Sequence, residues 1–120
     1  MKKLSKQLPD FDLTYTSAIL MNNADLYKEL LFDFYEDNHR KLAEIESLIA
    51  QQDFKTAAEL VHYIKGGAIS IGATKLHHCA HQLELELRHA KCDADNLKRF
   101  QEAFQETMQT IQKIPPKTAS

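Results

Sequence analysis

The chain has 120 residues, the size of one domain, and its 15 Lys and Arg stand against 17 Asp and Glu, a formal net charge of -2. This near-balance supplies no basic field for holding a phosphate backbone, which argues against a general nucleic-acid binder. Apolar residues make up 43% of the chain and charged residues 27%, which is typical of a globular protein and too apolar for a disordered one.

Redox and targeting signals point to the cytoplasm. Cys79 and Cys92 form neither a disulfide framework nor a CxxC pair, which is typical of a reduced, intracellular chain. The basic N-terminus is followed by Pro9 and Asp10, where a signal peptide requires an apolar run. No stretch reaches the ~18 apolar residues of a membrane span. We therefore expect a cytoplasmic protein without membrane insertion.

The first half of the chain predicts one short helix and one long one. Asp12 is a plausible N-cap for a helix over residues 13–21, and Asn23 for a helix over residues 24–51. The long helix either bends or projects past the core at its charged middle, residues 36–41. Apolar residues recur in it at three- and four-residue steps, which makes it one-sided: Leu26, Leu30, Leu31, Phe34, Leu42, Ile45, Leu48 and Ile49.

The second half predicts three more amphipathic helices, over residues 54–71, 73–91 and 94–114. Asp53 and Asp93 are good N-caps for the first and last of them, Gly72 ends the first, and Pro115-Pro116 stops the last. Each helix carries an apolar stripe: Phe54, Ala57, Val61, Ile64, Ala68 and Ile71; then Leu76, Ala80, Leu83 and Leu87; then Leu97, Phe100, Phe104, Met108 and Ile111.

Long helices joined by short breaks pack antiparallel to their neighbours. The predicted fold is therefore all-α, an antiparallel up-down-up-down four-helix bundle with a short N-terminal capping helix. We expect residues 8–114 to form this domain, with tails at residues 1–7 and 115–120. The apolar stripes match what a monomeric core requires, so we expect a monomer.

The pair Gly66-Gly67 is unusual, because it places two residues of low helix propensity inside the third predicted helix. Each glycine inside a helix costs roughly 0.5–1 kcal/mol relative to alanine. Two interpretations are open: the pair allows close packing of another helix, or it leaves room for an approaching partner. His62 lies one turn before Gly66, and Lys65 between them, so the three share one face beside the apolar stripe.

Glu84 is a candidate partner for His62. His62 lies eleven residues before Ala73 and Glu84 eleven after it, so in a helical hairpin both stand ~16 Å from the turn. Glu84 would accept a hydrogen bond from Nδ1–H of His62 and leave Nε2 as the nucleophile. The alternative is that Glu84 is a solvated surface charge, because helix rotation is not visible in a sequence.

These residues resemble the histidine-containing phosphotransfer (HPt) domain over about residues 8–112. The family's motif is His-x-x-Lys-Gly, followed six residues later by Gly-Ala and later by Leu-Glu. The matching residues are His62, Lys65 and Gly66, then Gly72-Ala73, Leu76 and Leu83-Glu84, with Arg88 beyond. Upstream matches are residues 8–12, Asp25-Leu26-Tyr27, Leu30-Leu31, Phe34 and Gln52-Asp53.

The resemblance implies a phosphorelay intermediate, a histidine phosphotransferase without kinase activity of its own. His62 would accept a phosphoryl group from a receiver-domain aspartate or a hybrid sensor kinase and pass it to another response-regulator aspartate. Lys65 would offset the negative charge of the phosphoryl oxygens, Gly66 would admit the receiver, and Glu84 would hold the other ring nitrogen. No cofactor of its own is implied, since Mg²⁺ belongs to the receiver.

Three residues depart from the family pattern. Gly67 stands where the family more often has Ser or Ala, and Tyr63 is bulkier than the usual neighbour of the histidine. Ile69, seven residues after His62, shares its face and stands where Gly or Ala is usual. Ile69 either widens an apolar docking patch or narrows the choice of receiver. We count Gly66, Gly67, Ile69 and Glu84 as supporting and docking residues.

Two other functions are alternatives to phosphotransfer: a metal site and a module that only binds a partner. His77 and His81 have the i, i+4 spacing of metal ligands, with His78 and Cys79 between them, but two ligands do not make a site and the HExxH glutamate is absent. We therefore expect solvated histidines and no metal. A bundle that only binds a partner is the other alternative, and acid-labile, alkali-stable label from a phosphorylated receiver distinguishes it.

The origin of the chain is open. The residues at 8–12 resemble the linker after a receiver domain, which favours the last domain of a hybrid kinase, whereas the Met1-Lys2-Lys3 start favours a free-standing protein. The cognate kinase, the receiver and the stimulus are not encoded in any motif.

Overall fold

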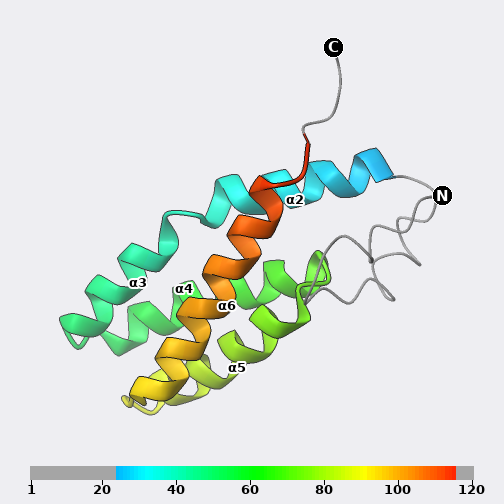
Figure 1. Ribbon diagram of the computed structural model, residues 1–120. Helices are drawn as coiled ribbons and strands as arrows, with labels where there is room; N and C mark the ends of the chain where they lie inside the picture. Colours follow the sequence, from blue (N-terminus) through cyan, green and yellow to red (C-terminus); the bar gives the residue numbers. More distant parts are fainter. Residues whose placement is uncertain (1–23, 116–120) are drawn as a thin grey trace.

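The structure is a computed structural model that describes residues 24–115, so the helix predicted over residues 13–21, its cap, the tail at residues 1–7 and all but the first residue of the tail at 115–120 lie outside it. The described part is all-helical (Figure 1). None of its helices combines the length and hydropathy that a membrane span requires. Its elements are α2 (Ala24–Asn38), α3 (Lys41–Ala50), α4 (Phe54–Ser70), α5 (Thr74–Arg88) and α6 (Ala94–Gln112).

The helix predicted over residues 24–51 is broken into α2 and α3 at His39-Arg40, within the charged stretch where a bend was one of two alternatives. Two side chains donate hydrogen bonds to backbone carbonyls at the end of α2. Asn38 donates through Nδ2 to the Phe34 carbonyl at 2.9 Å, and Lys41 donates through Nζ to the Asp37 carbonyl at 2.6 Å. Since Asn38 is only 2% exposed, this break lies against the core and is part of the fold.

The predicted helix ends are close to the observed ones. The Asp53 carboxylate accepts from the Thr56 amide, and the Asp93 carboxylate accepts from the amides of Asp95 and Asn96, which confirms both N-caps. Gly72, at φ 80°, follows α4 in the left-handed conformation that ends many helices. The amide of Ala73 then donates to the Ala68 carbonyl at 2.9 Å, which closes the end of α4.

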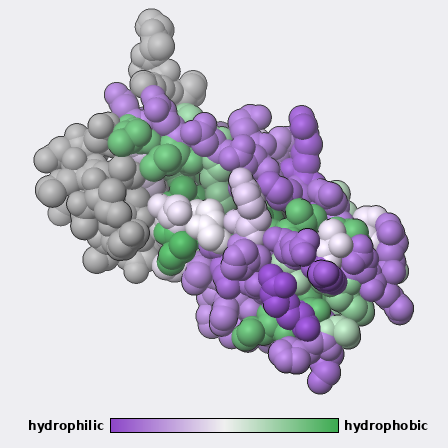
Figure 2. Space-filling model, turned by 180° about the vertical axis from the view of Figure 1, so that it is seen from behind, coloured by the Kyte–Doolittle hydropathy of each residue, from purple (hydrophilic) through white to green (hydrophobic). Residues whose placement is uncertain are grey.

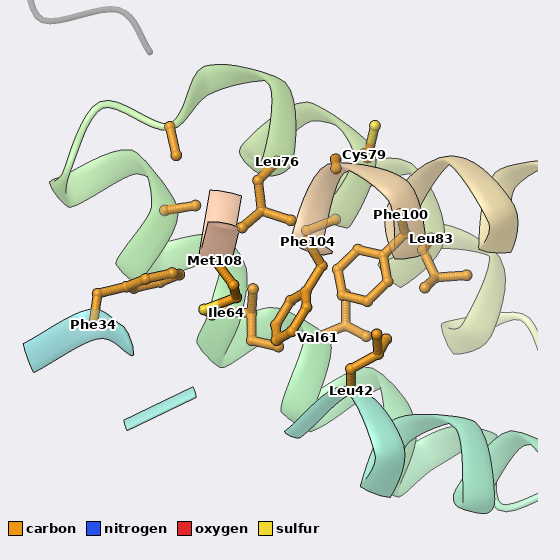
Figure 3. Packing of buried hydrophobic residues seen from close by; sticks show 14 of the residues in the cluster. Phe34, Leu42, Val61, Ile64, Leu76, Cys79, Leu83, Phe100, Phe104 and Met108 are labelled. Atoms are coloured by element: carbon orange, nitrogen blue, oxygen red, sulfur yellow. The ribbon is translucent and has the colours of Figure 1, made fainter. Parts of the chain in front are cut away.

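The core lies between the helices, where the predicted apolar stripes meet (Figure 3). Stripe residues from α4, α5 and α6 come together there, with Val61, Ile64, Leu76, Leu83 and Phe100 each at most 1% exposed. Fully burying a side chain of this kind contributes about 1.5–3 kcal/mol. These contacts therefore hold α4 and α5 rigidly in place beside α6.

The buried face of α2 differs from the prediction. Leu26 and Leu30 were expected in the stripe but are 39% and 37% exposed. Leu31 and Phe34 are buried as predicted, and Tyr27, which the predicted stripe did not include, is buried with them. A polar contact also favours this orientation of α2, because the Tyr27 hydroxyl donates a hydrogen bond to the Ile71 carbonyl at 2.6 Å.

Helices α4 and α5 lie side by side and share more contacts than any other pair (Figure 1). The short segment 71–73 joins them. His62 contacts Glu84, and Lys65, further along α4, contacts His77, which lies earlier on α5. The seam between these two helices therefore brings the residues around His62 together.

The two glycines of α4 face different surroundings. A Cβ on Gly66 would meet nothing within 4 Å, whereas a Cβ on Gly67 would lie 2.9 Å from the Cδ1 and Cε1 atoms of the Phe34 ring. Gly67 therefore allows α2 to pack closely on α4. Gly66 has no packing reason to be glycine within the described part of the chain.

This difference predicts opposite effects of alanine at the two positions. Gly66→Ala should raise the free energy of unfolding by about 0.5–1 kcal/mol, because alanine is the better helix former. Gly67→Ala should lower it by about 1–2 kcal/mol, since overpacking against Phe34 costs more than the helix gains. Urea unfolding of both variants measures the two signs.

A companion variant identifies the cause of the loss at Gly67. Shrinking the opposing side chain by Phe34→Leu should make Gly67→Ala less costly than it is in the wild-type background. Equal cost in both backgrounds would contradict the contact between Gly67 and Phe34 as its source.

Candidate functional site

His62 stands on the exposed side of α4 with its side chain 61% exposed. Its Nδ1 lies 3.0 Å from Oε2 of Glu84 on α5, so the contact expected from the equal heights of these residues is present. An ionised carboxylate only accepts hydrogen bonds, and Nδ1 therefore carries the hydrogen. That leaves the Nε2 lone pair of an exposed imidazole on a rigid helix.

Glu84 is buried, contrary to the alternative of a solvated surface charge, with 5% of the residue exposed. Lys65 on α4 places Nζ 2.7 Å from Oε1 of Glu84. Arg88, one turn further along α5, places both Nε and Nη2 2.8 Å from Oε2. One carboxylate thus binds an imidazole, an ammonium and a guanidinium, and the two cations compensate the cost of burying its charge.

The pKa of Glu84 lies below its ordinary value of 4.5. Burial acts in the opposite direction and raises the pKa, because it penalises the charged form. The hydrogen bonds from Lys65 and Arg88, with the positive charge of Lys65 and the electrostatic effect of the nearby His62 ring, outweigh burial. Glu84 is therefore an anion at neutral pH, as the hydrogen bond from His62 requires.

The surface around His62 combines open space with apolar side chains. Gly66, one turn on, is exposed, and Tyr63 and Ile69 are 56% and 41% exposed. Lys41 of α3 places its ammonium 4.2 Å from the centroid of the Tyr63 ring. On the face shown in Figure 2, hydrophobic residues form separate patches among hydrophilic ones. Gly67 does not belong to the open surface, because it faces Phe34.

The histidines of α5 do not assemble into a metal centre with other ligands in the described part of the chain. Within residues 24–115, no group of three or more His, Cys, Asp or Glu side chains is placed to hold a metal ion. His77 lies along the seam instead, with Nδ1 3.3 Å from the Lys65 carbonyl. His78 and His81 are exposed on the surface of α5.

Two ion pairs of the site were not predicted. Lys65 was assigned to the phosphoryl group alone, yet it also pairs with Glu84. Arg88 had no role, although its position four residues after Glu84 is the spacing at which opposite charges pair on a helix. That spacing is visible in the sequence. The pairing of Lys65 required the rotation of α4 against α5.

The site is thus an exposed imidazole on a helix face, beside a buried carboxylate and the two cations that pair with it. The Hpt domain family model matches residues 29–113, and the chain belongs to the Hpt domain family. This membership gives it a phosphotransfer role in two-component signalling, in which Hpt domains interact with receiver domains. Neither a curated protein nor a solved structure matches the chain.

The lowered pKa of Glu84 predicts how stability depends on pH. Because the folded-state pKa lies below 4.5, the contribution of ionised Glu84 is complete above about pH 4.5 and is lost as the pH falls through the folded-state pKa. Glu84→Gln should therefore lose less stability than the wild type on acidification below pH 4.5. Urea unfolding at several acidic pH values measures this difference.

Glu106→Gln is the matched control, since it removes an exposed carboxylate that pairs with Lys75 on the surface. It should keep the wild-type dependence on pH. A wild type and a Glu84→Gln variant that lose stability in parallel below pH 4.5 would contradict the assigned role of the Glu84 charge.

Proposed function

We propose that this protein is a phosphorelay intermediate in which His62 is the phosphoacceptor. His62 takes the phosphoryl group from an aspartate of a receiver domain, or from a hybrid sensor kinase, and passes it to an aspartate of another response regulator. The observation that carries this proposal is the exposed His62 ring, whose Nδ1 is bound by Glu84, so that Nε2 is the nitrogen available for attack.

The chemistry asks little of the acceptor beyond placement and charge. Phosphoryl transfer passes through a loose transition state, so catalysis consists mostly of positioning and electrostatic stabilisation. Glu84 fixes the ring and its tautomer, and the α4–α5 seam holds both. Lys65, three residues after His62 and 21% exposed in its side chain, is close enough to offset the charge of the phosphoryl oxygens.

Gly66 and Ile69 form the proposed contact surface for the receiver. A receiver must bring its aspartate in line with the phosphorus and His62 Nε2, and a side chain at position 66 would stand in its path. The exposed Ile69, on the same face of α4, adds apolar area to this contact. Gly67 contributes indirectly, by letting Phe34 pack against α4.

The Mg²⁺ of the reaction would come with the receiver. The groups beside His62 are mainly cations, which would repel a divalent metal ion. Lys65 and Arg88 are positively charged, and Glu84 already binds both of them. These groups suit a phosphoryl anion better than a divalent cation. The protein would therefore act as a histidine phosphotransferase without kinase activity of its own.

The proposal extends to the whole domain. Residues 8–114 would form an up-down-up-down bundle in which the helix predicted over residues 13–21 covers one end. The paired contacts of His62 with Glu84 and of Lys65 with His77 support this arrangement for α4 and α5, and the contact of Gln112 with Tyr35 relates α6 to α2.

The direct test is transfer of label to His62→Gln. A receiver domain carrying a radiolabelled aspartyl phosphate should label the wild type with acid-labile, alkali-stable phosphate and leave His62→Gln unlabelled. Since the His62 side chain is largely exposed, the variant should lose about 1 kcal/mol of stability or less. Circular dichroism verifies that it is folded.

The control for this test is His78→Gln, which removes an exposed histidine of α5 and should be labelled like the wild type. Wild-type labelling of His62→Gln would refute the assignment of His62. A wild type that takes no label from any phosphorylated receiver would favour a purely binding role.

A bulky residue at position 66 tests the approach of the receiver. Gly66→Leu replaces glycine by a good helix former, and the added Cβ meets no heavy atom within 4 Å, so the fold should be retained. Transfer from the receiver should slow on the order of 10²-fold, because a misplacement of about 1 Å between reacting groups has that effect. Single-turnover transfer kinetics measure it.

Gln105→Leu serves as the control, because it adds the same side chain at an exposed position of α6. It should transfer at the wild-type rate. A Gly66→Leu variant that transfers equally fast would show that the receiver does not pass over position 66.

A further inference from the structure

Glu84 carries a full negative charge, and this charge has a consequence for the phosphorylated state as well as for the free histidine. We propose that the Glu84 carboxylate keeps the proton on Nδ1 of phosphorylated His62, so that the ring departs as neutral imidazole when the phosphoryl group leaves. The inference rests on the proposed function for its significance, and it concerns how readily this protein gives its phosphoryl group away.

The electron count explains why this proton matters. When the P–N bond of phosphorylated His62 breaks and a P–O bond forms to the incoming carboxylate oxygen, the electron pair of the P–N bond returns to Nε2. If Nδ1 holds a proton, the phosphorylated ring is an imidazolium and the product is neutral imidazole. If Nδ1 has lost it, the product is an imidazolate anion, a far poorer leaving group. No proton moves in the favourable case.

The geometry places a negative charge at the atom that needs it. Glu84 Oε2 lies 3.0 Å from Nδ1, and the carboxylate is almost wholly buried, which strengthens its field at the ring. A neutral amide in this place would also accept the hydrogen bond. It would not balance the positive charge of the protonated ring, so the charge and the hydrogen bond are separable.

Other charges near the ring act against the proton or are remote from it. Lys65 from α4 and Arg88 from α5 are cations bound to the same carboxylate. From α3, Lys41 lies over the ring of Tyr63, the neighbour of His62. Among residues 24–115, Glu84 is the one side chain that hydrogen-bonds or forms an ion pair with His62. Removing the Glu84 charge therefore leaves cations in the majority.

The experiment follows the proton directly, in the full-length chain and without a receiver. Phosphoramidate, a small chemical phosphoryl donor, phosphorylates histidines, and the ³¹P resonance missing from His62→Gln identifies phosphorylated His62. We expect the pH midpoint of this resonance to lie at least about one unit lower in Glu84→Gln than in the wild type, a tenfold weaker hold on the proton. Glu106→Gln, which also removes one negative charge, should match the wild type.

A second variant gives the opposite sign and serves if Glu84→Gln does not fold. Arg88→Gln removes a partly exposed cation from Glu84 and should raise the midpoint. Midpoints of Glu84→Gln and wild type that coincide in folded protein, or a lower midpoint in Arg88→Gln, would overturn the inference.

The two proposals fail in different ways. If no receiver exchanges phosphate with His62, the proposed function is wrong while the midpoints measured with phosphoramidate still decide the role of Glu84. If receivers exchange phosphate but the midpoints coincide, only the inference about the proton is wrong. If both proposals are correct, transfer to a receiver slows as the pH is raised and the Nδ1 proton is lost. This slowing should begin at a lower pH for phosphorylated Glu84→Gln than for the phosphorylated wild type.

Discussion

A buried carboxylate must be paired, and in this protein that requirement organises the site. An isolated ionised carboxylate in an apolar environment is very costly, so Glu84 is stable in its buried position only because Lys65 and Arg88 reach it. The pairing fixes the orientation of Oε2, and Oε2 in turn fixes the ring of His62. Stability of the α4–α5 seam and order of the nucleophile therefore depend on one side chain.

The two adjacent glycines of α4 have different roles, because one faces another helix and the other faces open space. Gly67 is needed because a Cβ at this position would lie only 2.9 Å from the Phe34 ring, and this close packing joins α2 to the helix that carries His62. Gly66, one step around the helix, faces open space. Glycine lowers the stability of α4 at both positions. At Gly67 this loss is offset by the packing of Phe34, whereas at Gly66 the missing side chain keeps the surface beside His62 open to a partner.

Periodicity and capping rules were sufficient for most of the fold, because they depend on neighbours within a few residues. The apolar stripes of α4, α5 and α6 and the caps at Asp53 and Asp93 follow from such local patterns. At the break between α2 and α3, the buried Asn38 and the more exposed Lys41 bind backbone carbonyls of α2. Local patterns indicated a possible bend there but did not decide it.

The sequence predicted how far the site residues lie along α4 and α5 from the turn, but not how the two helices are rotated toward each other. Counting residues from the turn placed Glu84 level with His62, but the burial of Glu84 and its pairing with Lys65 depend on the angle of α4 against α5. In the same way, the rotation of α2 and α4 about their own axes decides which glycine faces Phe34 and that Leu26 and Leu30 face outward. Tertiary packing sets such angles, and no single helix encodes them.

The most direct test of this account is the tautomer of His62 in the unphosphorylated protein. Two-bond ¹H–¹⁵N correlation spectra at mildly alkaline pH distinguish a proton on Nδ1 from one on Nε2. The account predicts that His62 carries its proton on Nδ1, hydrogen-bonded to Glu84, and that this preference weakens in Glu84→Ala. A His62 ring protonated on Nε2 in the wild type would contradict it, since the nitrogen that must attack phosphorus would then have no lone pair to offer.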